Sequence, residues 1–253
     1  MTTLAVIPAR LGASRLPRKP LRLLAGLPLV VRVWQRVQSL HVAARCVIAT
    51  DSDEVADVVR PHGAEVILTS PRHPSGTDRV AEVAARPEFQ TFDAILNVQG
   101  DEPFVSGDAL RGAVSQVTSG NFPLGTAAVR VGESILDEPS VVKVVAADDG
   151  RAMYFSRAAI PFLRDAAEAP LRSTRVWQHI GVYAYARSAL AHWVSLPPHP
   201  LERIERLEQL RPLAAGLAMG VALIDEKPGI GIDTDEDLRR ANADWNAFEE
   251  RTR

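Results

Sequence analysis

The chain has 253 residues, a hydrophobic content of 46% and a formal net charge of −2. The near-neutral charge argues against nucleic-acid binding, and the single cysteine excludes a disulfide framework within the chain and is typical of a reducing compartment. No apolar run nears the ~20 residues that a membrane span requires, and Pro8 ends the first apolar stretch too early for a signal peptide. We therefore expect a cytoplasmic globular protein with no membrane or nucleic-acid partner.

Short apolar runs alternate with helix-like periodic segments through the first half of the chain. The predicted strands are Leu4–Ile7, Cys46–Ala49, Ala64–Leu68, Ala94–Val98 and Leu124–Val131. The predicted helices are Leu29–Leu40, a segment from Ser52 or Asp53 to Arg60, Thr77–Ala85 and Asp108–Thr118. This alternation predicts an α/β fold with a doubly wound, mostly parallel sheet.

The pattern changes after about Val141. We expect strands at Val141–Ala147, Ile180–Ala186 and Val221–Ile224, helices at Leu201–Leu213 and Asp235–Glu250, and a mobile loop at Asp165–Ser173. No repeat or clear linker divides the chain. We therefore predict a single domain over residues 1–253, with a smaller portion inserted near residues 140–215.

A basic loop follows the first predicted strand and contains Arg10, Ser14, Arg15 and Lys19. The first fifty residues hold eight Arg or Lys and no Asp or Glu, so the remaining residues have a net charge of −10. A cationic loop at the carboxyl end of a strand suits a polyphosphate, although it is not a Walker A loop because Gly-Lys-Ser/Thr is absent. The alternative is a solvated basic loop.

Two acidic segments follow apolar runs. Asp101 and Glu102 come after the strand that ends at Val98, and Asp233 precedes Thr234, which is a good helix N-cap. Carboxylates at the carboxyl edge of an open α/β sheet suit Mg²⁺ bound to nucleotide phosphates. The alternatives are an ordinary acidic turn for the first segment and a capping role for Asp233.

Other polar residues allow two interpretations each. Ser75 and Gly76 could contact a base or ribose, or form a helix start. Arg157 could hold a substrate carboxylate in a bidentate fork, whereas a lone histidine such as His179 is more often structural. Lys143 is either a guard on an edge strand or a cation that points into a site. The histidine spacing predicts no zinc site, and no nucleophile elbow is present.

Taken together, these segments resemble the 3-deoxy-manno-octulosonate (KDO) cytidylyltransferases, also called CMP-KDO synthetases. The matching motifs run in the family's order over nearly the whole chain: Ile7-Pro-Ala-Arg10, Ser14-Arg-Leu-Pro17, Lys19-Pro-Leu21, Ala49-Thr-Asp51, Ser75-Gly-Thr-Asp-Arg79, Asn97-Val-Gln-Gly-Asp-Glu-Pro103, Val142-Lys-Val-Val145, Tyr154-Phe-Ser-Arg-Ala158, His179-Ile-Gly-Val-Tyr-Ala-Tyr185, Leu207-Glu-Gln-Leu-Arg211 and Gly231-Ile-Asp-Thr234. The related sialic-acid enzymes share the opening motif but not Gln-Gly-Asp-Glu-Pro or Leu-Glu-Gln-Leu-Arg.

The resemblance implies a nucleotide-diphospho-sugar-transferase fold with a smaller dimerisation subdomain, and a cytoplasmic homodimer that supplies lipopolysaccharide biosynthesis. The implied reaction depends on Mg²⁺: the anomeric hydroxyl of KDO attacks the α-phosphorus of CTP in line, giving CMP-KDO and pyrophosphate. Implied catalytic residues are Lys19, Asp101 and Asp233, the two aspartates being metal ligands. Implied nucleotide contacts are Arg10, Ser14, Arg15, Lys19, Ser75, Gly76 and Arg79, and implied sugar contacts are Gln99, Arg157, His179, Tyr183, Glu208 and Gln209.

Four residues depart from the family's usual pattern: Arg18, Pro74, Ser140 and Ala186. Arg18 stands where glycine is common. Three alternative functions remain open at this point. They are the same reaction on a related acid sugar such as 8-amino-KDO or sialic acid, uridylyl or guanylyl transfer to a sugar phosphate, and a non-catalytic nucleotide-binding regulator.

Overall fold

The computed structural model describes residues 1–12, 15–226, 229 and 231–252. The chain divides into two compact units. The first unit comprises residues 1–107 together with 229–253, and the second comprises residues 108–228. The portion that we expect to be inserted near residues 140–215 lies within the second unit.

The first unit contains a parallel sheet with the strand order β6-β1-β4-β5. Its strands are β1 (Thr3–Ala9), β4 (Arg45–Thr50), β5 (Glu65–Leu68) and β6 (Ala94–Val98), and its helices are α1 (Leu29–Ser39), α2 (Asp53–Val59), α3 (Gly76–Ala85) and α9 (Asp235–Thr252). Short elements are η1 (Lys19–Leu21), β2 (Leu23–Leu24), β3 (Leu27–Pro28), η2 (Arg60–His62) and η3 (Pro87–Phe89). The strands and helices predicted for this unit are confirmed, with ends shifted by a few residues.

The buried strands of this unit explain why its apolar runs are continuous. Leu4, Val6 and Ile7 of β1 are fully buried, as expected for a parallel strand covered on both faces. Ser52 and Ser75 cap α2 and α3, because their hydroxyl oxygens accept hydrogen bonds from backbone N–H groups in the first turns. The caps place the loops that precede both helices beside the carboxyl edge of the sheet.

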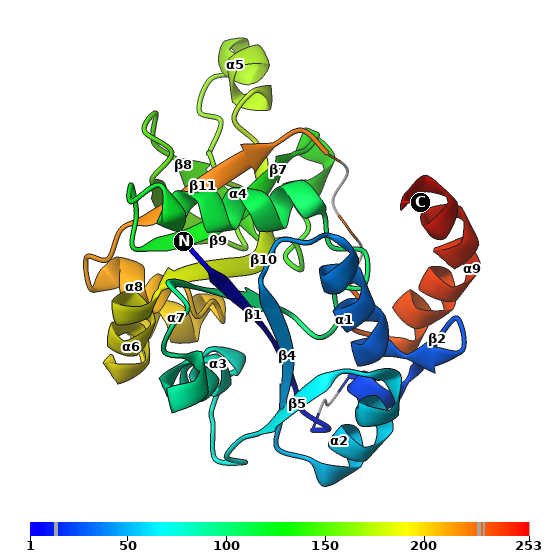
Figure 1. Cartoon of the computed structure of the whole chain (residues 1–253). Helices are drawn as coiled ribbons and strands as arrows, with labels where there is room; N and C mark the ends of the chain where they lie inside the picture. Colours follow the sequence, from blue (N-terminus) through cyan, green and yellow to red (C-terminus); the bar gives the residue numbers. More distant parts are fainter. Residues whose placement is uncertain (13–14, 227–228, 230, 253) are drawn as a thin grey trace. The chain divides into compact units, whose positions relative to one another are not determined.

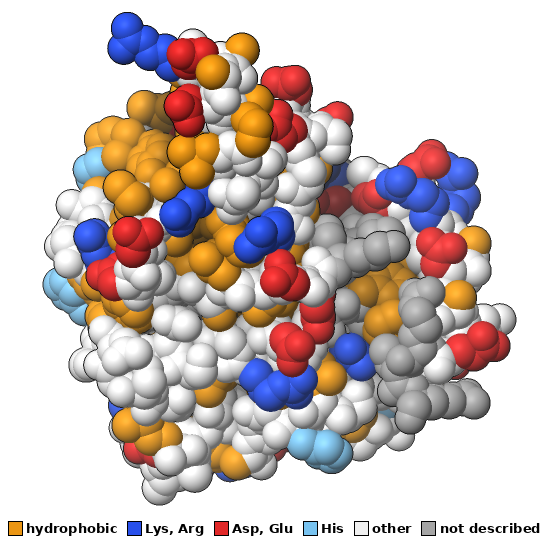
Figure 2. Space-filling model, turned by 90° about the horizontal axis from the view of Figure 1, so that it is seen from above, with side chains coloured by type: hydrophobic (Ala, Val, Ile, Leu, Met, Phe, Trp, Pro, Cys, Tyr) orange, Lys and Arg blue, Asp and Glu red, His pale blue; other side chains and the backbone are white. Residues whose placement is uncertain are grey.

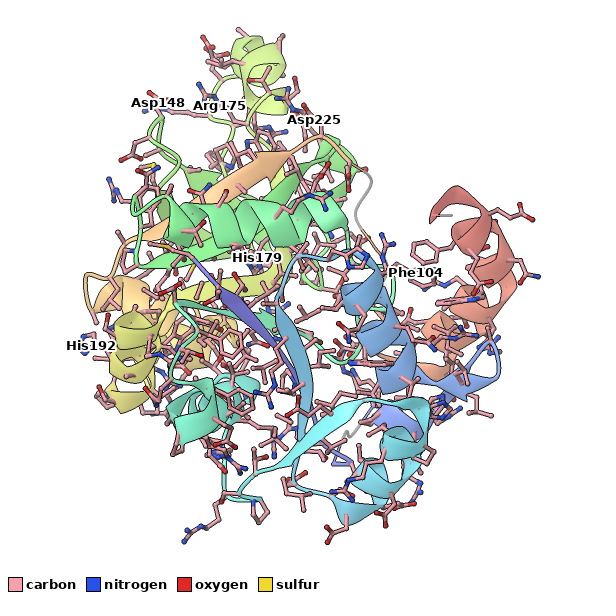
Figure 3. The ribbon with its side chains drawn as sticks, viewed as in Figure 1. Phe104, Asp148, Arg175, His179, His192 and Asp225 are labelled. Carbon is pink, nitrogen blue, oxygen red and sulfur yellow. The ribbon has the colours of Figure 1, made fainter. Side chains whose placement is uncertain are left out.

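The C-terminal helix α9 lies beside the β2–β3 hairpin (Figure 1). Leu16, Ile232 and Trp245 are buried in one apolar cluster, whose other buried members are Leu24, Leu29, Leu238 and Ala241. The aromatic ring of Phe104 (labelled in Figure 3) packs edge-to-face against the Phe248 ring of this helix, with 4.7 Å between the ring centroids. The cluster therefore joins the basic loop, through Leu16, to the segment that precedes α9, through Ile232.

The second unit is built on a mixed sheet. Strand β7 (Leu124–Arg130) is parallel to β11 (Met219–Ile224) and antiparallel to β10 (Trp177–Ala186), and β8 (Lys143–Ala146) pairs with both β10 and β9 (Ala152–Ser156). Its helices are α4 (Gly107–Thr118), α5 (Ala169–Ser173), α6 (Arg187–Ser195), α7 (Pro200–Glu205) and α8 (Leu210–Ala214), with short turns η4 (Glu133–Ile135) and η5 (Ala166–Glu168). Helix α4 approaches β7 so closely that a Cβ at Gly125 would collide with the Ala113 carbonyl.

Two expectations for this unit are wrong, and one of the two interpretations of Lys143 is excluded. Residues 201–213 do not form one helix, because Arg206 adopts a left-handed conformation (φ 56°) and separates α7 from α8. The expected loop at Asp165–Ser173 contains η5 and α5. Lys143 is not a guard on an edge strand, because β8 lies between β9 and β10. Strand β9, helix α6 and, in the first unit, the β2–β3 hairpin were not predicted.

No helix in the described part of the chain is both long enough and apolar enough to cross a membrane.

Candidate active site

Lys19 joins two aspartates that are distant in sequence. Its Nζ lies 2.6 Å from Oδ2 of Asp101 and 2.7 Å from Oδ1 of Asp233. The lysine side chain is mostly buried, whereas Asp233 is 42% exposed. Burial alone would lower the pKa of Lys19, but the charges and hydrogen bonds of the two aspartates outweigh it and raise that pKa. The structure thus brings together the three residues that we predict to be catalytic.

Backbone packing at the edge of the sheet explains how the two aspartates meet. Asp101 follows β6 through Gly100, where a Cβ would stand only 2.8 Å from the Pro8 carbonyl oxygen, so a side chain at this position would displace the β1 backbone. The backbone N–H of Ile232 then donates to the Asp101 carbonyl at 3.0 Å. This bond holds the residue before Asp233 directly against Asp101.

Asp233 is also held by the first turn of α9. Oδ2 of Asp237 accepts hydrogen bonds from the backbone N–H groups of Asp233 (3.2 Å) and Thr234 (2.9 Å), and the Thr234 hydroxyl accepts from the Asp237 N–H (3.1 Å). The two residues therefore satisfy backbone donors at the helix start reciprocally. Thr234 is the helix cap that we predict, and the Asp233 carboxylate is left to contact cations.

The rest of the basic loop contributes one more cation to this cluster. Arg15 is largely exposed, and its guanidinium lies 3.0 Å from Oδ2 of Asp233. Arg10 is exposed, and Ser14 lies outside the described residues. Arg18 turns away to form an ion pair with Glu54. Of the predicted phosphate contacts, Lys19 and Arg15 therefore lie at the aspartates.

Glu102 belongs to the first acidic segment but is not among the site residues that the family resemblance implies. It is half-buried beside this cluster, and one carboxylate oxygen lies 2.9 Å from the point where a Cβ on Gly231 would stand. Burial raises the pKa of Glu102 to about 8, with further contributions from Asp101 and Asp233. The adjacent pair of acids was visible in sequence, but only packing distinguishes the environment of Glu102 from that of Asp101.

The predicted nucleotide contacts Ser75, Gly76 and Arg79 divide into two groups. The Cβ position of Gly76 lies 4.0 Å from Oε1 of Gln99, a predicted sugar contact, so these two residues are neighbours next to the Ser75 cap. Arg79 is instead buried, and its guanidinium donates to Thr69 and, at 3.0 Å, to Asp51. Thr69 in turn bonds to the Thr50 carbonyl, so Arg79 ties together the carboxyl ends of β4 and β5.

In the second unit, His179 (labelled in Figure 3) and Tyr183 both belong to β10, with ring centroids 5.4 Å apart. The Thr126 hydroxyl donates to the Val182 carbonyl (2.7 Å) and lies 2.9 Å from Nε2 of His179. Because a hydroxyl has one proton, Nε2 of His179 is the donor in that contact, and Nδ1 is then an acceptor. Burial lowers the pKa of His179 to about 3, so the ring is neutral at physiological pH.

Arg157 and Lys143 bind backbone carbonyls of the second unit. The guanidinium of Arg157 donates to the carbonyls of Glu205 (2.8 Å) and Pro139 (2.9 Å), and Nζ of Lys143 donates to those of Glu138, Val141 and Arg157 at 2.6–3.0 Å. Lys143 is fully buried, so it is a structural cation and not one that points into a site. The remaining predicted sugar contacts, Glu208 and Gln209, adjoin the start of α8 and are half-buried and buried, respectively.

Asp101 and Asp233 have the chemistry of metal ligands. In the described part of the chain, no group of three or more His, Cys, Asp or Glu side chains is arranged to hold an ion. However, Asp101 and Asp233 direct one oxygen each at a single point, where the Lys19 ammonium lies. Two hard carboxylate oxygens that converge on a cation fit Mg²⁺, which commonly takes one or two carboxylates and completes its shell with phosphates and water.

Comparisons with known proteins identify the class to which the chain belongs. The sequence model described as "Cytidylyltransferase" matches residues 4–223. The inositol-1-phosphate CTP transferase from T. maritima has the same fold with a TM-score of 0.66 at 13% identity, covering 99% of this chain and 96% of that one. The fold has a mostly parallel sheet and flanking helices, and the match to the family model makes the protein a nucleotidyltransferase of the cytidylyltransferase class.

More similar relatives identify the family within this class. A 3-deoxy-manno-octulosonate cytidylyltransferase from Gemmatimonas aurantiaca is 66% identical, covering 98% of this chain and 96% of the relative, and one from Polynucleobacter asymbioticus is 44% identical over 94% and 93%. A solved CMP:2-keto-3-deoxy-manno-octonic acid synthetase complexed with CTP superimposes with a TM-score of 0.88 at 34% identity, covering 98% and 99% of the two chains. The chain belongs to the 3-deoxy-manno-octulosonate cytidylyltransferase family, which confirms the resemblance.

Proposed function

We propose that this protein transfers CMP from CTP to the anomeric hydroxyl of KDO, giving CMP-KDO and pyrophosphate for lipopolysaccharide biosynthesis. The observation that supports this most directly is the contact of Lys19 with both Asp101 and Asp233. This contact brings together in one site a cation that can bind a polyphosphate and two carboxylates that can bind the accompanying metal ion. The family relationship supplies the identities of the nucleotide and the sugar.

The residues of the first unit have separable tasks in this proposal. Lys19 and Arg15 neutralise the phosphates and stabilise the charge that develops on the leaving pyrophosphate. Gly76 and the Ser75 cap offer a closely packed surface for the nucleoside. In-line transfer of this kind depends mostly on positioning and charge stabilisation, so no covalent nucleophile is required.

Asp101 and Asp233 would hold Mg²⁺. When bound, the ion would supply charge neutralisation at the phosphates and lower the pKa of the attacking hydroxyl. Backbone bonds from Ile232 and to Asp237 hold the two carboxylates in place before any ligand arrives.

We assign sugar recognition to residues of the second unit. His179 would act as a neutral hydrogen-bonding group, because its pKa is far below neutrality. Arg157 would position the neighbouring backbone, because its guanidinium already donates to two carbonyls. These roles predict that a His179→Gln variant keeps partial activity, since glutamine also offers a donor and an acceptor.

We also propose that the protein is a cytoplasmic homodimer that associates through the second unit. Figure 2 shows apolar side chains gathered on one face of this unit. Phe162 is 83% exposed and Ile204 is 76% exposed, with Met153 and Leu171 also exposed. Exposed apolar side chains of this size are typical of a protein–protein interface.

The decisive experiment is pyrophosphate release from CTP, KDO and Mg²⁺ by the wild type and an Asp101→Ala variant. We expect the variant to lose turnover by at least about 10³-fold while it remains folded, because it loses a metal-binding carboxylate. Glu236→Ala removes an exposed acid near Asp233 and serves as a matched control that retains activity. Near-normal turnover by Asp101→Ala would contradict the proposal. Replacing KDO with 8-amino-KDO or sialic acid, and CTP with UTP or GTP, tests the substrate assignment.

A further inference from the structure

We propose that Lys19 closes the metal site of the nucleotide-free protein, so that a divalent cation binds only together with CTP. This inference rests on the proposed function, because it takes Asp101 and Asp233 as the metal ligands. It adds an order of binding that follows from how the charges of this particular site are paired.

The carboxylate oxygens that would bind a metal are already in use. Nζ of Lys19 contacts Oδ2 of Asp101 and Oδ1 of Asp233 at 2.6 and 2.7 Å, and Arg15 lies 3.0 Å from the other oxygen of Asp233. A magnesium ion needs its oxygen ligands at about 2.0–2.1 Å. An ammonium and a dication that share the same two oxygens would lie within a few ångströms of each other and repel strongly.

The net charge of the cluster also opposes the binding of a free metal ion. Lys19 and Arg15 bring two positive charges to the two negative charges of Asp101 and Asp233, so the four groups together are neutral. A cluster of zero net charge attracts a free dication weakly. Metal binding in this state would also leave the mostly buried Lys19 ammonium without its partners, which is costly.

A polyphosphate offers a way to exchange these partners. Lysine has a flexible four-carbon stem and binds phosphate as a point charge, so Lys19 can turn from the carboxylates to a nucleotide while its backbone stays in η1. Phosphate oxygens then replace the carboxylates around Lys19, and the freed carboxylates accept the dication. Coupling of this kind is reciprocal, so metal must strengthen CTP binding by the same factor as CTP strengthens metal binding.

The alternative hypothesis is that Lys19 only binds phosphate. In that case, replacing Lys19 would weaken CTP binding and leave the affinity for free metal unchanged. If Lys19 also closes the metal site, its replacement by methionine must weaken CTP binding and strengthen binding of free metal at the same time. These opposite changes in one variant cannot result from a general loss of structure.

We would measure Mn²⁺ binding by equilibrium dialysis, with CTP at equal free concentration on both sides where it is present and without KDO. The wild type should bind Mn²⁺ weakly alone and about tenfold or more tightly with CTP, in the range usual for coupled sites. Lys19→Met should bind Mn²⁺ alone about tenfold more tightly than the wild type does, with Lys19→Gln as a second variant in case the first does not fold. Arg22→Met is a matched control, because Arg22 pairs with Asp235 and not with the cluster.

The outcomes separate the two proposals. Equal Mn²⁺ affinity of the wild type with and without CTP, or an unchanged affinity in folded Lys19 variants, would overturn the closed site while the metal site itself stands. If Asp101→Asn binds Mn²⁺ in the presence of CTP as well as the wild type does, the metal assignment in the proposed function fails. Opposite changes in CTP and Mn²⁺ affinity in Lys19→Met would support both proposals.

Discussion

The Asp237 carboxylate accepts hydrogen bonds from the backbone N–H groups of both Asp233 and Thr234. A first-turn acid of α9, which sequence alone presents as one of several acids favoured by the helix dipole, therefore holds the residue that we propose as a metal ligand. The relationship connects the stability of the C-terminal helix with the geometry of the site.

Replacement of Asp237 by alanine should affect both stability and the site. We expect the free energy of unfolding to fall by about 1 kcal/mol, as for other lost helix caps, and Mn²⁺ binding in the presence of CTP to weaken. Urea denaturation and dialysis measure the two effects. Glu236→Ala, one residue earlier in the same turn, is the control, and equal Mn²⁺ affinities of the two variants would show that Asp237 does not position Asp233.

Lys143→Met should destabilise the second unit. Nζ of Lys143 donates to three backbone carbonyls inside the protein, and methionine fills a similar volume but leaves these acceptors unpaired. We expect a loss of roughly 3 kcal/mol, since hydrogen bonds of charged groups are stronger than average and unpaired buried acceptors are costly. Thermal unfolding of Lys143→Met and Lys143→Arg measures this loss. A melting temperature of Lys143→Met equal to that of the wild type would contradict the structural role.

The Glu82 carboxylate should make stability depend on pH in the acid range. Burial would raise the pKa of Glu82, but hydrogen bonds from the Ser70 N–H, His73 and Arg86 outweigh it and lower that pKa to about 2. A lowered acid pKa stabilises the folded state above the unfolded value of about 4.5, and this stabilisation is lost as pH falls toward 2. Glu82→Gln should therefore be less stable than the wild type by about 1 kcal/mol at pH 7. Urea midpoints at pH 7 and pH 3 test whether this difference shrinks in acid.

Arg18→Gly should be tolerated or stabilising. Arg18 has φ 57° and ψ 32°, a left-handed conformation that costs an L-residue roughly 1–2 kcal/mol and that glycine adopts freely. The variant loses the exposed ion pair with Glu54, which is worth at most about 1 kcal/mol. We expect an unfolding free energy between unchanged and about 1 kcal/mol higher, whereas Arg18→Ala should lose stability because it removes the ion pair and keeps the strain. Urea denaturation measures the stability of both variants. If the ion pair with Glu54 outweighs the backbone strain, Arg18→Gly will be less stable than the wild type, which would contradict this prediction.

The left-handed turn at Arg18 (φ 57°) is a conformation that suits glycine, the residue that the family resemblance leads us to expect at this position. The sequence gives only the residue type at position 18. The structure gives its left-handed backbone conformation, which glycine adopts more readily than arginine. Arg206 is a similar case, because its left-handed conformation breaks the helix that the apolar periodicity of residues 201–213 predicts. Periodicity records which side chains are buried, and it does not contain the backbone angle of an intervening residue.

Local sequence was sufficient for features that depend on neighbouring residues. The apolar run of β1, the serine caps of α2 and α3 and the Thr234 cap of α9 follow from side chains within a few positions of one another. The types of residue in the site could likewise be predicted, because a cationic loop and two acidic segments each follow a strand or precede a helix.

Only the tertiary structure decided which of these groups meet. Lys19 could have remained a solvated cation, but it lies between Asp101 and Asp233, which are 82 and 214 residues away in sequence. Arg79 has the same charge, yet packing buries it at the carboxyl ends of β4 and β5, where it pairs with Asp51. Such pairings depend on which apolar segments, far apart in the chain, are buried against one another. The cluster that contains Leu16 and Ile232 is an example. A local sequence pattern does not contain this information, because it covers only residues that are neighbours in the chain.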